Sequence, residues 1–494
     1  MVNNIIIAGG VVMNRSELKN TINNACDIMR QDGLGIMDYM EQLSWLFFLK
    51  AVSEQEEEYK TLAQLKGKEY ERILPEKYIW DQWAEDDNLT GDELIDFVNN
   101  MFQELSILAG TEMQDMIGVI FTNLRNHMRN GYSLREVINK VDEVKFATDS
   151  DVIVLSEIYE SLLQDLNEAG AGGEYYTPRH IIQMMIKIVE PEIGDKIYDP
   201  AAGTCGFLTE AFTYFKEQSD KIDAEKWEQL REKTFFAREK SPRTYIFGIM
   251  NMIIHGIDHP HVSRSNTLSD NIRNVSEKEK YDVIMTNPPY GGKEGEMILQ
   301  NFPIKIKKTE ALFLQHIMSY LKQNGKAAVI IPEGVLFRGG KEERIRKKIL
   351  EEFNLHTVVS LPAGVFLPYT AVKTNILFFD NTHPTKDVWF YELHHDGYEL
   401  KPTRQADPAN NDIPDLLEKI KNREESEQSW LVEVDEIAGN NYNLTASRYN
   451  PNPGDGEELA DPEELLTELL SKEQMITDEL NNVLEQLESG VYDE

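Results

Sequence analysis

The amino-acid sequence predicts an α/β fold with a doubly wound parallel sheet, preceded by a helical region and followed by a coiled-coil-like helix. Three apolar runs indicate strands of the sheet: the first ends at Asp199, the second at Glu239, and the third at Thr286, directly before Asn287. Ligands bind at the carboxyl ends of the strands in such sheets. We therefore expect the polar residues that follow these three runs to share one binding site.

The chain has 494 residues, which is enough for about three domains. We expect a helical domain at residues 14–150, an α/β catalytic domain at 151–450, and a linker with a C-terminal helix at 451–494. In the first of these, Ser16 can cap a helix, and the segment that follows is apolar at helical spacing. The aromatic residues predicted to be core in this domain are Trp45, Phe47, Phe48, Trp80 and Trp83.

The last segment of the chain follows a linker rich in Pro, Asn, Gly and Asp, and Asp461 with Pro462 is typical of a helix start. Its apolar side chains alternate by threes and fours, as in a coiled coil. They are Leu466, Leu469, Ile476, Leu480, Val483 and Leu487. A helix that packs on its own domain would show the same pattern, but the linker favours a partner chain.

The tetrapeptide Asn287-Pro288-Pro289-Tyr290 combines residue types that suit a planar group with an exocyclic amino substituent. The amide oxygen of Asn287 can accept a hydrogen bond from such an amino group. The two prolines fix the backbone and leave carbonyl groups free, and Tyr290 offers a flat face for stacking. A tight turn rich in Asn and Pro, without any ligand, is the alternative.

The turn after the first strand contains two glycines, Gly203 and Gly206. Small residues let the backbone approach a cofactor closely, and the following helix presents free N–H groups. The spacing differs from the dinucleotide motif, so a dinucleotide is disfavoured. Glu239 ends the second strand and can accept hydrogen bonds from two ribose hydroxyls. Taken alone, the glycine turn could lack a ligand, and Glu239 could be a solvated loop charge. The glycine turn, Glu239 and the tetrapeptide in this order are a much rarer combination than any one of them.

This ordered set resembles the Rossmann-like S-adenosyl-L-methionine-dependent methyltransferases that modify exocyclic amino groups. Residues 170–179 are similar to the segment before the cofactor strand in adenine-specific DNA methyltransferases. Further similar segments are 156–160, 251–256, 325–337, 361–366 and 374–379. Together these segments resemble the modification (methylation) subunit of type I restriction-modification systems, over most of residues 14–450.

The resemblance implies methyl transfer from S-adenosyl-L-methionine to N6 of a flipped adenine in DNA, without a metal. The catalytic residues would be Asn287, Pro288, Pro289 and Tyr290. The residues that would hold the methionine part of the cofactor are Glu174, Tyr175, Tyr176, Thr177, Pro178, Arg179, Asp199, Ala201, Gly203, Thr204, Cys205 and Gly206. Glu239 would bind the ribose. Asn266, with Thr267, stands where relatives often carry Asp, and its amide oxygen can still accept from the cofactor's adenine.

The mechanism follows from the groups in the tetrapeptide. The amino nitrogen of adenine is a poor nucleophile, and hydrogen bonds to Asn287 Oδ1 and the Pro288 carbonyl would favour a tetrahedral nitrogen with an available lone pair. Positioning then supplies much of the acceleration. Extruding the base costs a few kcal/mol, which stacking on Tyr290 partly recovers. A cytosine C5 mechanism would need a Pro-Cys loop, whereas Cys205 lies in the cofactor turn.

The net charge of −36 opposes DNA binding, because DNA affinity depends on phosphate neutralisation. The resemblance resolves this conflict, since it implies that a separate specificity subunit recognises the double-stranded DNA target. A second copy of the methylation subunit and a restriction (nuclease/translocase) subunit would be further partners. We expect the basic patch at residues 305–308 to meet phosphate beside the flipped base, and the patch at 338–348 to be the solvated face of a helix.

The cysteine content and hydropathy indicate a cytoplasmic enzyme without a membrane partner. Cys26 and Cys205 make no disulfide framework and no zinc-type spacing. Residues 1–12 are apolar but short and lack a basic region, so they are neither a signal peptide nor a membrane span.

Two other functions use the same features. A protein glutamine methyltransferase or an RNA base amino-methyltransferase could carry the same tetrapeptide, because the glutamine amide has the same planar shape with an amino group. A non-catalytic scaffold could retain the fold. The large helical region and the acidic C-terminal helix favour the DNA complex, and the intact Gly203, Glu239, Asn287 and Tyr290 argue against a scaffold.

Overall fold

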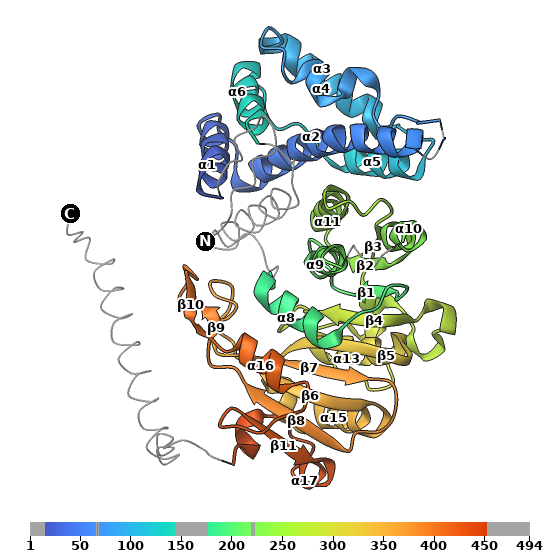
Figure 1. The fold of residues 1–494 in the computed structure, drawn as a ribbon, viewed down its shortest axis with the longest axis vertical. Helices are drawn as coiled ribbons and strands as arrows, with labels where there is room; N and C mark the ends of the chain where they lie inside the picture. Colours follow the sequence, from blue (N-terminus) through green and yellow to red (C-terminus); the bar gives the residue numbers. More distant parts are fainter. Residues whose placement is uncertain (1–14, 66, 68, 145–175, 219–222, 452–494) are drawn as a thin grey trace, which may run out of the picture. The chain divides into compact units, whose positions relative to one another are not determined.

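The computed structural model shows an N-terminal helical region and an α/β region with a central sheet, which confirms the expected fold (Figure 1). It describes residues 15–65, 67, 69–144, 176–218 and 223–451. The coiled-coil-like helix expected near the C-terminus lies outside the described residues. Of the helices in the described ranges, none is both long enough and apolar enough to cross a lipid bilayer.

The N-terminal region consists of helices whose apolar faces meet in one core. They are α1 (Arg15–Gln31), α2 (Ile36–Leu65), η1 (Glu76–Tyr78), α3 (Trp80–Trp83), α4 (Gly91–Ser106), α5 (Glu112–Asn123) and α6 (Gly131–Asp142). The five aromatic residues predicted to be core are all buried. The ring of Trp45 meets Phe102 edge to face at 5.2 Å. Capping starts α5, where Thr111 accepts from Gln114 N, and α6, where Asn130 is the cap.

Nine strands form the central sheet, in the order β11-β8-β6-β7-β5-β4-β1-β2-β3. They are β1 (Ile197–Asp199), β2 (Phe235–Glu239), β3 (His261–Arg264), β4 (Tyr281–Thr286), β5 (Leu321–Pro332), β6 (Asn354–Ser360), β7 (Thr374–Asp380), β8 (Asp387–Glu392) and β11 (Ser429–Glu433). The sheet is mixed rather than wholly parallel, because β7 runs antiparallel to β5 and β6, and β11 antiparallel to β8. No helix lies between β6 and β7, so β7 can return beside β6 without a crossover.

The chain reverses its direction of winding at β1. It proceeds to β2 and β3 on one side of β1, then returns to β4 and β5 on the other. Tyr198 of β1 pairs in parallel with both Phe236 of β2 and Ile284 of β4. The carboxyl ends of β1, β2 and β4 therefore lie side by side at a topological switch point, where ligands bind in open α/β sheets.

Helices cover the sheet and share its apolar cluster. They are α8 (Arg179–Val189), α9 (Gly206–Lys216), α10 (Ala224–Lys233), α11 (Pro242–Ile254), α12 (Glu296–Leu299), α13 (Thr309–Tyr320), α14 (Gly334–Phe337), α15 (Lys341–Glu352), α16 (Ile413–Lys419) and α17 (Val434–Gly439). Met185 of α8 and Phe207 of α9 share one apolar cluster with Met285 of β4 and Phe378 of β7. Phe378 is therefore core. Shorter elements are η3 (Thr267–Ser269), η4 (Ile272–Asn274), η5 (Glu277–Glu279), η6 (Ala446–Tyr449), and the antiparallel pair β9 (Asp396–Tyr398) and β10 (Ala406–Asn411).

Helix α11 packs on two cores at once. Ser241 caps it, and Pro242 occupies its first turn. Ile246 and Met250 belong to the apolar cluster of the N-terminal helices, whereas Met252 belongs to that of the sheet. Because α11 starts three residues after Glu239, the N-terminal helices pack against the helix that begins beside this residue.

Candidate active site

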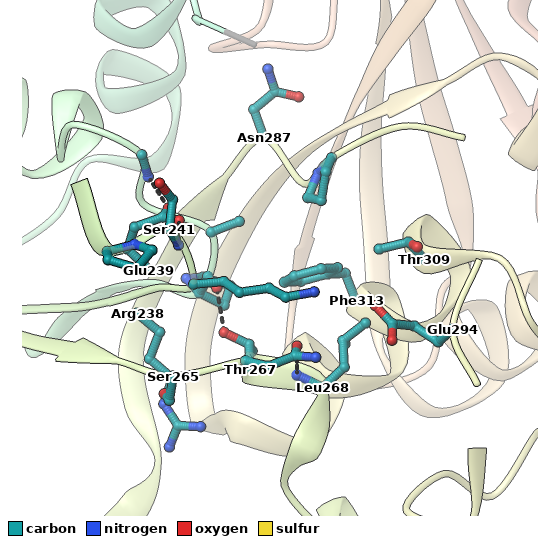
Figure 2. A pocket seen from close by; sticks show the side chains of 17 residues that line it. Arg238, Glu239, Ser241, Ser265, Thr267, Leu268, Asn287, Glu294, Thr309 and Phe313 are labelled. Atoms are coloured by element: carbon teal, nitrogen blue, oxygen red, sulfur yellow. Dashed lines mark hydrogen bonds between the residues drawn. The ribbon is translucent and has the colours of Figure 1, made fainter. Parts of the chain in front are cut away.

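A cavity of about 600 Å³ opens where the carboxyl ends of β1, β2, β3 and β4 converge. Figure 2 shows Glu239 and Ser241 along one side of it, Thr309 and Glu294 along the other, and Phe313 between them. Its lining comes from residues 200, 201 and 203 after β1, 238–242 at the end of β2, 265–268 after β3, 287, 289 and 294 after β4, and 309 and 313 of α13. The three turns that the sequence singled out therefore border one cavity.

Glu239 ties the β1 turn to the β2 turn. Its Oε2 accepts from the Gly203 N–H at 2.9 Å and its Oε1 from the Ser241 N–H at 2.7 Å. Gly203 has a φ of 53°, a conformation that favours glycine. Each carboxylate oxygen has two lone pairs, and Glu239 borders the cavity.

Asp199 is a buried carboxyl group with one oxygen left over. Its Oδ1 accepts from the Thr286 hydroxyl at 2.7 Å and from the Ala201 N–H at 3.0 Å. Within the described residues, its Oδ2 accepts no hydrogen bond. Burial raises the pKa of Asp199 to about 7, although the two hydrogen bonds oppose the shift. A cationic donor at Oδ2 would satisfy this oxygen and favour the charged form.

The side chain of Cys205 points into the core. It is fully buried, and a Cβ placed on Gly248 of α11 would come within 2.8 Å of its Sγ. Burial raises the pKa of this thiol well above its ordinary value. Cys205 has a φ of 64° and is the cap residue of α9, while the carbonyl of Thr204 accepts from Asn251 Nδ2 at 2.8 Å. The backbone of this turn, ending at Gly206, thus borders the start of α9.

Asn266 and Thr267 line the cavity from the turn that follows β3. Asn266 Oδ1 caps η3 by accepting from the Leu268 N–H at 3.1 Å. The hydroxyl of Thr267 donates to the Pro200 carbonyl at 2.6 Å, which fixes the two turns to each other. The Asn266 amide keeps its second oxygen lone pair and its NH₂ group for a ligand.

The tetrapeptide after β4 is folded onto itself. Asn287 is buried, its Nδ2 donates to Thr177 Oγ1 at 2.9 Å, and its Oδ1 accepts a short hydrogen bond from the Tyr290 hydroxyl. Pro288 is buried and Pro289 borders the cavity. The ring of Tyr290 meets Phe366 edge to face at 6.5 Å. The oxygen predicted to receive an amino group is thus covered by the tetrapeptide's own hydroxyl.

The loop after Tyr290 is anchored to the start of α13. The Gly291 N–H donates to Glu310 Oε1 at 2.6 Å. A Cβ on Gly292 would collide with the Thr309 side chain, so glycine is required there. These contacts hold the loop beside Phe313, which faces the cavity from the same helix.

The segment before α8 contacts the tetrapeptide but does not itself line the cavity within the described residues. Glu174 and Tyr175 lie outside the described residues, and Tyr176 is half-buried. Thr177 contacts Asn287, Pro178 caps α8, and Arg179 Nε lies 2.6 Å from Glu210 Oε1 of α9. Glu210 is buried, so Arg179 holds a charge that would otherwise be costly.

Sequence reasoning missed several residues that border the cavity, among them Arg238, Pro242 and Phe313. Phe313 lies in an almost wholly buried helix, next to Leu312 and Leu314, and nothing in the pattern distinguishes it from core. Arg238 immediately precedes Glu239, and a basic residue at a strand end is a signal that could have been followed. The link from Thr177 to Asn287 spans 110 residues, and no local pattern predicts it.

Comparison with known proteins identifies the family. A model described as "HsdM N-terminal domain" matches residues 18–141, and one described as "N-6 DNA Methylase" matches residues 150–457. The chain is 38% identical, over 94% of its length and 96% of the relative's, to the EcoEI type I restriction enzyme methylase subunit of Escherichia coli. This chain belongs to the type I methylase subunits. The family resemblance found in the sequence is thereby confirmed.

Other relatives agree with this assignment. The StySPI methylase subunit of Salmonella potsdam is 30% identical over 88% of this chain and 83% of its own. A solved modification subunit assigned to a type I restriction enzyme of Vibrio vulnificus YJ016 superposes with a TM-score of 0.81, at 34% identity, over 90% of this chain and 99% of that one. A chain solved in work on assembly and conformational transition of the type I R-M system gives 0.72 at 40% identity, over 97% and 100%. The methylase subunit is thus an enzyme of the N6-adenine DNA methyltransferase family.

Proposed function

We propose that this methylase subunit transfers a methyl group from S-adenosyl-L-methionine to N6 of an adenine flipped out of double-stranded DNA. A separate specificity subunit recognises the target sequence in this proposal. The observation that carries it is the single cavity bordered by both Glu239 and Asn287, because donor and acceptor must meet within one enclosure for direct transfer.

The residues around the cavity fit S-adenosyl-L-methionine. Asp199 stands directly before the lining residue Pro200, and its Oδ2, which accepts no hydrogen bond within the described residues, suits the ammonium of the methionine part. The carboxylate of Glu239, which lines the cavity, suits the ribose hydroxyls. Asn266 and Thr267 border the space left for the adenine, with Phe313 close by as an apolar wall. Thr204, Gly206 and the segment that includes Tyr176 and Arg179 complete the proposed methionine end. When bound, the cofactor would supply a methyl group that is strongly electrophilic because it is bonded to a sulfonium sulfur.

The tetrapeptide would prepare the acceptor nitrogen. Asn287 Oδ1 accepts one N–H of the adenine amino group and the Pro288 carbonyl accepts the other, so that the nitrogen lone pair points into the cavity. Thr177 holds the NH₂ end of the Asn287 amide at 2.9 Å, which leaves Oδ1 as the end that faces the base. The Tyr290 hydroxyl must leave Oδ1 when the base enters, and its ring then stacks on the base.

Partners follow from charge and family. A chain with 86 acidic and 50 basic residues needs help to hold DNA, and we propose the specificity subunit for this role. A second copy of the methylase subunit and a restriction subunit would complete the complex. The proposed division of labour within the chain is residues 14–150 as a helical domain that helps to clamp DNA, 151–450 for catalysis, and the segment after 451 for the specificity subunit. Neither glutamine nor RNA is favoured as the acceptor, because the matching relatives are DNA methylase subunits.

The test is co-expression with the specificity subunit and transfer of tritium from labelled S-adenosyl-L-methionine to DNA. We expect N6-methyladenine with wild type only when the partner is present, and none with Asn287→Ala. Asn422→Ala, at an exposed position far along the chain, is the matched control and should behave as wild type. Label on protein or RNA, or on DNA without the partner, would contradict the proposal.

A further inference from the structure

The lysine patch at residues 305–308 lies against the loop that follows Tyr290. Lys293 forms a β-bridge with Lys308. The Glu294 N–H donates to the Lys307 carbonyl at 2.8 Å, and the Thr309 N–H donates to the Gly292 carbonyl at 3.1 Å. The loop and the patch are therefore one small structural unit, and a ligand held by the patch is held in register with the tetrapeptide.

The second basic patch of the sequence divides into two parts with different surroundings. Its beginning joins the first patch, because Lys341 Nζ donates to the Lys305 carbonyl at 2.5 Å and Lys308 pairs with Glu342 at 2.8 Å. In its later part, Lys347 and Lys348 are neutralised along α15, since they lie 3.6 Å from Glu351 and Glu352, while Arg344 of the same helix is exposed. The expected solvated helix face is found only in this later part.

Arg346 fixes the joint between the two parts. It was expected on the solvated face but is buried, with 1% of its surface exposed. Its Nη1 donates to the carbonyls of Val335 and Arg338 at 2.8 Å each, and its Nε donates to the Tyr442 carbonyl at 2.6 Å. The backbone at Arg338 is thereby held rigidly, while the Arg338 side chain is exposed.

Lys307 of the first patch is exposed but lies 3.1 Å from Glu296. Four other exposed cations lie on the loop, the first patch and the beginning of the second patch, and we name them the basic ridge: Lys293, Lys305, Arg338 and Lys341. Within the described residues none of the four forms an ion pair with a carboxylate. Lys305 donates to Gln300, and Lys341 donates to a backbone carbonyl. In a chain with a net charge of −36, a cluster of cations without carboxylate partners beside the acceptor loop requires a function.

We propose that the basic ridge binds backbone phosphates of the DNA strand that carries the target adenine, directly beside the flipped nucleotide. This inference rests on the proposed function. Phosphate contacts fix position and register but carry no sequence information, which matches a subunit that leaves sequence recognition to another chain. An acidic surface of a partner subunit is the competing occupant. Phosphate is favoured because the ridge is built on the same segments that hold the acceptor loop.

The experiment uses the complete complex with its specificity subunit and compares pairs of substitutions. The main pair is Lys293→Gln with Arg338→Gln, whose side chains donate no hydrogen bond within the described residues. A second pair is Lys305→Gln with Lys341→Gln. The matched control is Lys347→Gln with Lys348→Gln, which removes two cations that already have carboxylate partners. DNA affinity is measured over a range of salt concentrations, together with KM for DNA, kcat, and the Kd for S-adenosyl-L-methionine.

We expect each ridge pair to reduce the slope of log affinity against log salt by about two, since each lost phosphate contact contributes about 0.9. KM for DNA should rise roughly tenfold at moderate salt, while the cofactor Kd and the control pair remain at wild-type values. The unchanged cofactor Kd also shows that the variants are folded, because no ridge residue lines the cavity.

Three results would overturn the inference, and they differ from one another. If wild type methylates DNA and the ridge pairs keep the wild-type salt slope, the ridge does not bind phosphate, although the proposed function stands. If wild type methylates no DNA with its partner, the proposed function fails and the ridge fails with it. If the ridge pairs lose the specificity subunit at an unchanged slope, the ridge is a protein interface. If the Lys305→Gln and Lys341→Gln pair loses cofactor binding, that pair is not correctly folded. The salt slope of the Lys293→Gln and Arg338→Gln pair then decides whether the ridge binds phosphate.

Discussion

The two halves of the cavity are held in opposite ways. On the cofactor half, Glu239 accepts from two backbone N–H groups and Thr267 is bound to the Pro200 carbonyl, so the polar side chains are oriented by the backbone. On the acceptor half, Asn287 and Tyr290 satisfy each other. The first half is oriented by backbone groups, whereas the second presents an acceptor that its own chain has covered.

Under the proposed function, the half that would hold the cofactor is oriented before a ligand arrives, whereas the acceptor half would have to rearrange. Entry of adenine would exchange the Tyr290 hydroxyl for the adenine amino group at Asn287 Oδ1. One hydrogen bond replaces another, so the net cost is small, of the order of 1 kcal/mol. The exchange also releases the Tyr290 ring to follow the base. We therefore expect substitutions in the two halves to separate cofactor binding from DNA methylation.

The largest effect should come from Asn287→Ala on the acceptor half. Removing a positioned polar group of this kind lowers kcat by about 10²–10³-fold. The Kd for S-adenosyl-L-methionine should stay within about twofold of wild type, because Asp199 and Glu239 are untouched. Single-turnover methylation and isothermal calorimetry measure the two quantities. A parallel loss of cofactor affinity would break the distinction between the halves.

Asp199→Asn should have the converse effect on the cofactor half. The substitution keeps the shape but removes the charge that we propose for the cofactor's ammonium. Cofactor Kd at pH 8 should rise about 10- to 100-fold, the range for a hydrogen bond to a charged group. Saturating cofactor should restore most of kcat. Asp435→Asn, at an exposed position, is the control.

The same residue predicts a pH dependence. Burial raises the pKa of Asp199 to about 7, so the carboxyl group is protonated below that pH and charged above it. Cofactor affinity of wild type should therefore increase between pH 6 and pH 8, whereas that of Asp199→Asn should not. Without cofactor the sign is reversed. A raised pKa stabilises the fold fully below the unfolded value of about 4, and this contribution is lost as pH rises through about 7. Without cofactor, the melting temperature of wild type should therefore fall relative to that of Asp199→Asn as the pH rises from about 4 to about 7. If the difference in melting temperature between the two proteins does not change with pH, the raised pKa is excluded.

Substitutions at Tyr290 sharpen the account of the acceptor half. Tyr290→Phe keeps the ring and removes the hydroxyl that covers Asn287 Oδ1, so kcat/KM for DNA should stay within about threefold of wild type. Tyr290→Ala removes stacking worth about 1–3 kcal/mol, and kcat/KM should fall by about tenfold or more. Fluorescence of 2-aminopurine at the target position would report flipping directly. Equal losses in both variants would mean that the hydroxyl, not the ring, is the essential group.

The smallest effect should be a gain, from Asn266→Asp. The amide oxygen of Asn266 already caps η3, and a carboxylate would keep that cap while accepting more strongly from the cofactor's adenine amino group. The expected gain is about 1 kcal/mol, or roughly fivefold in cofactor Kd. Adenosine analogues without the amino group provide the control, since they should show no gain. A gain of the same size with the analogue would place the effect elsewhere.

Several parts of the site could be predicted from sequence because they are local. The Asp199 turn, Glu239 and Asn287 each follow a strand whose apolar run is visible in the residues, and parallel strands bring their carboxyl ends to one edge. The comparisons with known proteins confirm the family, and the structure confirms the fold. The roles of the individual site residues and the domain boundaries remain predictions.

Other features could not be predicted because they depend on where distant segments meet. The contact between the Thr177 hydroxyl and Asn287 joins segments 110 residues apart, while the expected role of Thr177 beside the cofactor stays a prediction. Arg346 carries the charge of a solvated residue but binds four carbonyls from inside the protein, and Cys205 turns its sulfur toward Gly248. A charged or small residue looks the same in the sequence whether its side chain is buried or exposed to solvent. Only the packing of the folded chain distinguishes the two environments.

The sequence by itself determined the order of strands and turns, the residue types at each turn, and the family, because hydrophobic periodicity and turn chemistry act over a few residues. The tertiary structure alone decided that β7 runs antiparallel, that Tyr290 covers the Asn287 oxygen, and that two basic segments 33 positions apart form one ridge. These outcomes follow from which surfaces can be buried together and which buried polar groups find partners. Both are properties of the whole packed chain, and no short segment contains them.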